Sequence, residues 1–231
     1  MVGAAGFEPT LTESESGVLP LNYAPMRGVL YNVFFRFAMK IYAFGWRGGR
    51  FCGIMSPMNI PLSDVIRFHL VRTHCHIDCV NYFAGLLDAA FPMHDRDKFT
   101  EPYQTGYAYR NYMVYHPNMQ MLPQQAELYR RVHDEHHHMQ PHHVGAWDDV
   151  RQIPKSILTE MVCDWHSANF EQTVILKQTE YESVRAFYDR VMSRLAWSDA
   201  QREFILELIA ELARRVDNDA VRAIWTLALE L

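Results

Sequence analysis

The sequence predicts an all-α fold, because apolar residues recur at helical spacing, capping residues precede several of these stretches, and no alternating strand pattern appears. The clearest stretch starts after Pro61, with Ser63 or Asp64 as the helix cap. Its apolar positions lie three and four residues apart, which places them on one face of a long helix or of two abutting helices. They are Val65, Phe68, Val71, Cys75, Cys79, Phe83, Leu86 and Leu87.

Further helices are expected at residues 124–137, at about 153–168, and at about 180–195, 198–215 and 218–230. Ser198 followed by Asp199 is typical of a capped helix start. Residues 99–123 are rich in Tyr, Asn, Gln and Pro and keep no long period, so they predict a loop with short helical pieces. Pro92 ends the first helical pattern just before His94 and Asp95, which are therefore expected at the start of a new turn or helix.

The composition describes an ordinary globular chain. A length of 231 residues suits one good hydrophobic core, so one main domain is expected. Hydrophobic residues make up 49% and charged residues 21%, and the net charge of -5 does not favour a nucleic-acid-binding surface. The four cysteines form no Cys-x-x-Cys pair, and no apolar run is long enough for a transmembrane segment, so we expect a cytoplasmic protein.

Residues 1–58 differ in composition from the rest of the chain. Residues 1–26 are polar and aperiodic and predict a disordered tail; from Gly6 to Pro25 they also resemble the conceptual translation of a transfer-RNA gene, which indicates a mistranslated extension. Residues 27–58 form a basic aromatic extension, which fits an unstructured segment, a helix on the domain, or a membrane-surface or partner-binding element. The helical domain is expected at residues 59–231, with Met55 and Met58 as alternative translation starts.

Histidines are concentrated between His133 and His143, a stretch that holds six of the chain's twelve. First-row metal coordination is the commonest reason for such a density. The metal-ligand candidates in this stretch are His136, His137, His138 and His142. On a continuous helix His136 and His138 point roughly 200° apart, so they cannot both bind one ion. The favoured choice is therefore His136 or His137 together with His142.

Three other stretches carry residues that could complete such a site: His76, the His94-Asp95 pair, and Glu160 with Asp164. An adjacent His-Asp pair at a helix start can supply two ligands, because the two side chains diverge by about 100°. A divalent ion in a helical protein needs imidazoles and carboxylates from several helices. His76 and Asp164 are placed to supply them.

Plainer interpretations of the same residues stay open. Asp95 can simply cap a helix, Asp164 can pair with an arginine, and His69 or His74 can replace His76. Zincin, di-iron, P-loop and serine-hydrolase sites are excluded, because the spacings that define them are missing.

Three motifs occur in a fixed order: His-Asp-Arg-Asp-Lys-Phe at residues 94–99, His-His-His-Met-Gln-Pro-His-His at residues 136–143, and Glu-Met-Val-Cys-Asp-Trp at residues 160–165. With His76 ahead of them, they give the order His, His-Asp, histidine group, Asp, which resembles the HD-domain metal-dependent phosphohydrolases. They are more closely similar to an uncharacterised bacterial and phage family with an HD-like fold. Asp97 stands where that family has Ser, and Gln140 where it has Asn.

The resemblance implies an all-α, HD-domain-like helical bundle with a divalent metal ion held by His76, His94, Asp95 and Asp164. It also implies that part of the histidine stretch holds a second ion or the substrate phosphate. The expected chemistry is hydrolysis of a small phosphorylated substrate, with nucleotides among the candidates. Lys98 would stabilise charge on the phosphate, and Asp95 or Glu160 would orient the water or take its proton.

Two functions of different classes are therefore carried forward. The first is a metal-dependent phosphohydrolase, and the alternative is a non-catalytic metal-binding module in which the ligands join helices. The sequence does not distinguish Mn, Fe, Co, Ni, Mg and Zn, and it fixes neither the substrate nor the oligomeric state.

Overall fold

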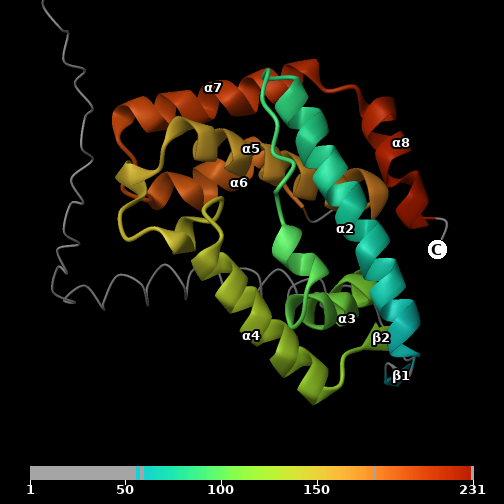
Figure 1. Ribbon diagram of the computed structural model, residues 1–231. Coiled ribbons are helices and arrows are strands. Elements are labelled where there is room, and N and C mark those ends of the chain that lie inside the picture. Colours follow the sequence, from blue (N-terminus) through green and yellow to red (C-terminus); the bar gives the residue numbers. More distant parts are fainter. Residues whose placement is uncertain (1–55, 58–59, 179–180, 230–231) are drawn as a thin grey trace, which may run out of the picture.

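The computed structural model describes residues 56–57, 60–178 and 181–229 (Figure 1). The expected tail at residues 1–26 and nearly all of the extension at residues 27–58 lie outside the described residues. Within the described residues the fold is all-α, as predicted, with seven α-helices. These are α2 (Leu62–Gly85), α3 (Tyr103–Tyr115), α4 (Pro123–Met139), α5 (Lys155–Phe170), α6 (Val184–Arg190), α7 (Asp199–Arg215) and α8 (Asn218–Leu229). A short parallel bridge joins β1 (Ser56–Pro57) to β2 (Met119–Gln120).

The helices are arranged around α2, which contacts α3, α5 and α8. α3 lies near the N-terminal end of α2, whereas α7 lies near its C-terminal end (Figure 1). α4 packs on α3, and α7 packs on α5. None of the described helices is both long and apolar enough to cross a lipid bilayer.

Two hydrophobic clusters stabilise this arrangement. The larger one combines α2 with α5, α6, α7 and α8, and it includes the fully buried side chains of Phe83, Met161 and Trp225. The smaller one is centred on Val65 and Ala108, where α3 packs on α2. Burial of these apolar side chains provides the main driving force for folding.

The prediction of a loop with short helical pieces at residues 99–123 is wrong in extent, because this region contains the 13-residue helix α3. The buried face of α3 consists of Gly106, Tyr107, Ala108, Arg110 and Asn111. Small and polar residues thus stand where large aliphatic side chains would have given a readable period. Packing on α2 and α4 stabilises this helix, as tertiary contacts commonly do.

The helix expected at residues 180–195 is shorter than predicted. α6 begins after Ser183, whose Oγ accepts a hydrogen bond from Ala186 N at 3.2 Å, and it ends at Arg190. A 3-10 helix follows at Met192–Arg194. α5, in contrast, continues into a π-helical turn at Glu171–Ile175.

The segment after α2 turns back alongside that helix (Figure 1). Asn81 fixes it from α2, because its side chain donates to Phe91 O at 3.2 Å and accepts from Phe91 N at 2.7 Å. The segment then enters a 3-10 helix at Arg96–Phe99. His94 and Asp95 are thereby held against α2, with His94 Nε2 3.4 Å from His76 Nε2.

Candidate metal centre

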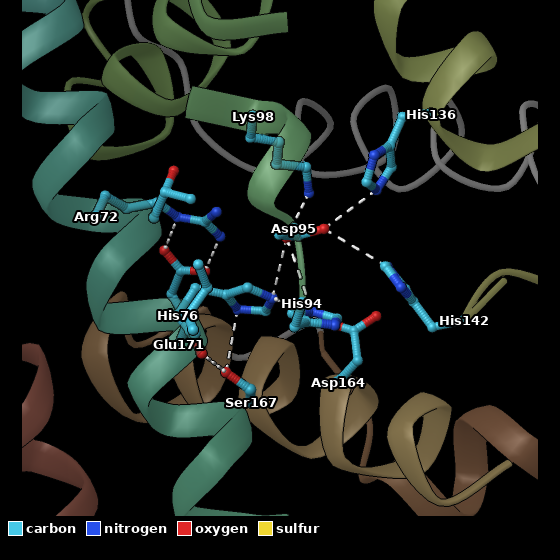
Figure 2. A network of polar contacts seen from close by, with 12 residues as sticks. Arg72, His76, His94, Asp95, Lys98, His136, His142, Asp164, Ser167 and Glu171 are labelled. Atoms are coloured by element: carbon cyan, nitrogen blue, oxygen red, sulfur yellow. Dashed lines mark hydrogen bonds and ion pairs between the residues drawn. The ribbon is translucent and has the colours of Figure 1, made fainter. Parts of the chain in front are cut away.

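Asp95 lies at the centre of a buried polar cluster (Figure 2), and its side chain is 2% exposed. Its backbone is in the left-handed region, with φ 54° and ψ 20°, immediately before the 3-10 helix. Few residues other than glycine adopt this conformation, although aspartate does so more readily than most. Such backbone strain is concentrated at functional sites. Here it accompanies a carboxylate whose two oxygens face different sets of side chains.

The first group comprises His76, His94, Asp95 and Asp164, which meet on the Oδ2 side of Asp95. His76 Nε2, from α2, lies 3.6 Å from Asp95 Oδ2 and 3.1 Å from Asp164 Oδ1 on α5. His94 Nε2 lies 3.8 Å from each of these two carboxylate oxygens. Ligands that share one ion at about 2.1 Å stand roughly 3.0–3.4 Å apart. The observed spacing is close to that, so the structure brings together four residues that the sequence placed in one site.

The second group comprises Asp95, His136, His142 and His143, on the Oδ1 side of Asp95. His136 Nε2, from α4, lies 3.2 Å from Asp95 Oδ1, and His142 Nε2 lies 3.5 Å from the same oxygen. His143 Nε2 is 2.9 Å from His136 Nε2. Figure 2 shows His136 and His142 both directed at this oxygen. One carboxylate therefore stands between two groups of metal-ligand type.

Several of the inward-facing imidazoles are held from behind, through Nδ1. The Nδ1–H of His94 donates to Glu160 Oε1 at 2.9 Å, and that of His136 donates to Asp97 Oδ2 at 2.7 Å. His76 Nδ1 lies 3.1 Å from Ser167 Oγ. A histidine that binds a metal through Nε2 characteristically donates its other N–H to such a partner, which fixes the tautomer and the ring orientation.

Two buried atoms of the second group test whether a cation fits. Within the described part of the chain, neither Asp95 Oδ1 nor His142 Nε2 makes a hydrogen bond of good geometry, although Asp95 Oδ1 lies 3.2 Å from His136 Nε2 and 3.5 Å from His142 Nε2. Buried polar atoms are normally satisfied, and an ion or an ordered water is the usual explanation when protein partners are missing. A divalent cation would satisfy both atoms at once.

The charges of the centre also favour the binding of a cation. Asp95, Asp97, Glu160 and Asp164 each contact a histidine of the two groups. Among the described residues, the ammonium that contacts these carboxylates is that of Lys98. Buried charges are costly unless they are paired or coordinate a metal. Four carboxylates against one ammonium therefore suit a centre that takes up cations.

Ionisation in the first group is strongly perturbed. Burial opposes protonation of His94, yet the Asp95 carboxylate and a hydrogen bond to Asp164 raise the pKa of His94 to about 10. Burial by itself would raise the pKa of Asp95, but Lys98 and His94 hold it well below its usual range. The pKa of Asp164 is likewise depressed against the effect of burial, by hydrogen bonds to His76 and His94. These shifts favour a proton on His94 between ionised carboxylates, and a cation held by the same side chains would compete with that proton.

Lys98, the residue expected to meet a phosphate, lies at the edge of the first group. Its Nζ donates to Asp95 Oδ2 at 2.6 Å and lies 4.6 Å from the ring centre of Tyr107. Its side chain is 11% exposed. Glu160, expected to orient or deprotonate water, instead contacts His94 at Nδ1, on the far side of the ring from Nε2.

Two of the predicted metal ligands, His137 and His138, lie outside both groups. His138 is exposed, and its Nδ1 bonds the Asp134 carbonyl at 2.7 Å. His137 stacks on His143, with ring centres 3.9 Å apart and planes 7° apart. A helix rotates by roughly 100° per residue, so α4 directs His136 inward and turns the next two histidines away from Asp95.

Sequence reasoning missed His143, Asp97 and Ser167. The signal for Ser167 was available, because it follows Asp164 by three residues and shares a face of α5 with it. Asp97 was noted as a departure from the similar family, but its partner His136 lies on another helix. The path of the chain after Pro141, which directs His143 toward His136, gives no periodic signal.

The fold and site define an all-α protein with buried His, Asp and Glu clusters that are compatible with metal binding. The chain belongs to a family of unknown function, DUF5662, whose profile it matches over residues 66–211. No curated protein and no solved structure matches it. The resemblance to HD-domain phosphohydrolases stays a prediction from the motifs.

Proposed function

We propose that the protein is a metal-dependent phosphohydrolase whose catalytic centre is formed by the first and second groups. The observation that carries this proposal is the Asp95 carboxylate, which turns one oxygen toward each of two sets of imidazoles. Each group would hold one divalent ion, with Asp95 between them. A divalent ion in such a site lowers the pKa of a bound water toward neutrality and polarises a phosphoryl oxygen.

The protein's own side chains suit an anionic substrate once cations are present. Lys98 provides a fixed positive charge beside Asp95. Asp164 and Lys98 keep 15% and 11% of their side chains exposed, whereas His94 and His136 keep none. A substrate would therefore meet the carboxylates and the Lys98 ammonium rather than the fully buried rings of His94 and His136. Glu160 would orient His94 in place of the water-activating role expected from the sequence.

The test combines metal analysis with a hydrolysis screen. The purified chain is expected to retain a divalent metal, and to hydrolyse phosphorylated small molecules, nucleotides included, with one of Mn²⁺, Co²⁺, Ni²⁺ or Mg²⁺. Asp95→Asn is expected to remove this activity while the far-ultraviolet circular dichroism stays helical. His138→Ala is the matched control, since this exposed histidine lies outside both groups. Unchanged activity in Asp95→Asn would contradict the proposal.

A non-catalytic metal-binding module is the second candidate, and the burial of the centre favours it. His94 and His136 are fully buried, and both contact the Asp95 carboxylate. An ion there would link α2, α4, α5 and the 3-10 helix, as structural metals do. Metal-dependent stability without turnover of any phosphate ester would support the module over the enzyme.

A further inference from the structure

Glu160 contacts one imidazole from each group. Its Oε1 lies 2.9 Å from His94 Nδ1 and 3.5 Å from His142 Nδ1. His94 belongs to the first group and His142 to the second, and their ring centres are 4.2 Å apart. The side chain of Glu160 is 13% exposed, so its carboxylate is largely shielded from water. The two groups are thus connected twice, by Asp95 at Nε2 and by Glu160 at Nδ1.

We propose that Glu160 is a positioning residue that couples the two ion sites, so that occupation of one prepares the other. This inference rests on the proposed metal centre and adds to it a cooperative uptake of two ions. Asp95 would contribute one carboxylate oxygen to each ion site, and Glu160 would orient one histidine ligand of each.

The coupling arises because a single oxygen, Glu160 Oε1, contacts the imidazoles of both His94 and His142. An imidazole binds a metal through Nε2 only when Nδ1 carries the proton, and a carboxylate at Nδ1 favours that tautomer. An ion held by the first group would fix the ring of His94 with its Nδ1–H directed at Glu160, and this would order the Glu160 carboxylate. The ordered carboxylate then orients His142 for the second ion. Ordering done by the first ion need not be repeated for the second, which gives positive cooperativity.

Two other residues make the same kind of contact with a single group, and they serve as matched controls. Ser167 lies behind His76 of the first group, at 3.1 Å from Nδ1. Asp97 accepts from Nδ1 of His136 in the second group at 2.7 Å. Glu160 alone among these three supports both groups. Loss of the Glu160 carboxylate should therefore weaken Mn²⁺ binding at both ion sites, whereas each control substitution should weaken it at one.

The experiment measures Mn²⁺ binding to the full chain by calorimetry in two single-site backgrounds. His142→Ala removes a ligand of the second group and keeps the first group intact. His76→Ala removes a ligand of the first group and keeps the second intact. Glu160→Gln is expected to weaken Mn²⁺ binding by about 10- to 100-fold in both backgrounds. Ser167→Ala should act only in the His142→Ala background, and Asp97→Asn only in the His76→Ala background. A Glu160→Gln effect confined to one background, or absent from both, overturns the inference.

Two further readouts separate positioning from simple packing. The visible absorption of bound Co²⁺ reports ligand geometry, and Glu160→Gln is expected to change it in both backgrounds. The second readout is the Mn²⁺ binding isotherm of the wild-type protein, which is expected to show two bound ions and a Hill coefficient above 1. A Hill coefficient of 1 or less overturns the coupling.

The outcomes also distinguish this inference from the proposed function. Wild-type protein that binds no divalent metal contradicts both. Wild-type protein that binds two ions and hydrolyses phosphate esters, but responds to Glu160→Gln at one site only, contradicts the coupling and leaves the hydrolase standing.

Discussion

The imidazole of His69 donates a hydrogen bond to the backbone carbonyl of Lys98 across 2.9 Å, and so joins α2 to the 3-10 helix beside the candidate metal centre. Asn111, on α3, donates to the other ring nitrogen at 2.8 Å. This arrangement requires a neutral ring, with one nitrogen donating and one accepting. Burial accordingly lowers the pKa of His69 to about 4.

The metal-free protein is therefore expected to lose stability as the pH falls from about 6.5 toward 4. In this window the unfolded chain, with an ordinary histidine pKa near 6.5, binds a proton that folded His69 does not. The contribution is fully present above about pH 6.5, and its loss at acid pH is on the order of 3 kcal/mol. Urea unfolding between pH 4.5 and 7.5 measures it.

His69→Gln provides the comparison, because a glutamine amide can donate and accept without titrating. The variant is expected to be less stable at pH 7.5 but to lose less stability on acidification. His133 and His166, whose pKa values burial also lowers to about 4, contribute in both proteins, so the difference between them is the informative quantity. His74→Gln, at an exposed position of α2, should behave like wild type. Parallel pH profiles for wild type and His69→Gln would contradict the prediction.

Some residues of the candidate site could be predicted from the sequence, and others could not. His76 and Asp164 could be assigned because each lies on a strongly periodic helix, and His94 with Asp95 because Pro92 marks the preceding break. α3 could not be predicted, since its buried face uses glycine, alanine, tyrosine and polar side chains that packing, not periodicity, selects. The contacts of Asp97 and Glu160 depend on how separate helices are placed, which local patterns do not encode.

Gly106 sets the distance between α3 and α4. A Cβ at this position would lie 2.4 Å from Val132 Cγ2, and Val132 is fully buried. Gly106→Ala is therefore expected to destabilise the protein by about 1–3 kcal/mol. It should also weaken Mn²⁺ binding to the second group, because α4 carries both Val132 and His136. Denaturant unfolding and calorimetry measure the two effects.

Gly85 is the matched control for that substitution. It is exposed at the end of α2, and a Cβ there would meet nothing within 4 Å. Gly85→Ala should be neutral or stabilising by up to about 1 kcal/mol, through helix propensity alone. Equal effects at the two glycines would show that close contact between α3 and α4 is not what Gly106 provides.

The partly buried Arg72 and the buried Glu171 form an ion pair that joins α2 to the π-helical turn after α5. Arg72 Nε donates to Glu171 Oε1 at 2.8 Å, Arg72 Nη2 pairs with Oε2, and Tyr115 OH donates to Oε1 at 2.9 Å. Their side chains are 16% and 5% exposed. Glu171→Leu leaves the guanidinium without its carboxylate and is expected to cost about 3–5 kcal/mol.

Replacing both partners distinguishes this cost from lost packing. Arg72→Met combined with Glu171→Leu removes both charges and should recover most of the stability in urea unfolding, because apolar side chains of similar size can replace a buried pair. A double variant as unstable as Glu171→Leu alone would show that packing, rather than the uncompensated charge, sets the loss.

Bound metal is expected to stabilise the fold through both groups. The first and second groups draw residues from α2, α4, α5 and the segment around Asp95, and these contacts are absent from the unfolded chain. At free Mn²⁺ about 100 times the dissociation constant, each ion should add about 2.7 kcal/mol to the free energy of unfolding. Chelation should reverse this gain.

In thermal unfolding, His142→Ala, which removes a ligand of the second group only, should keep roughly half of the stability gained from Mn²⁺. His138→Ala should keep all of it, because that exposed side chain faces neither group. A His142→Ala variant that gains as much stability from Mn²⁺ as wild type would remove the second group from the metal centre.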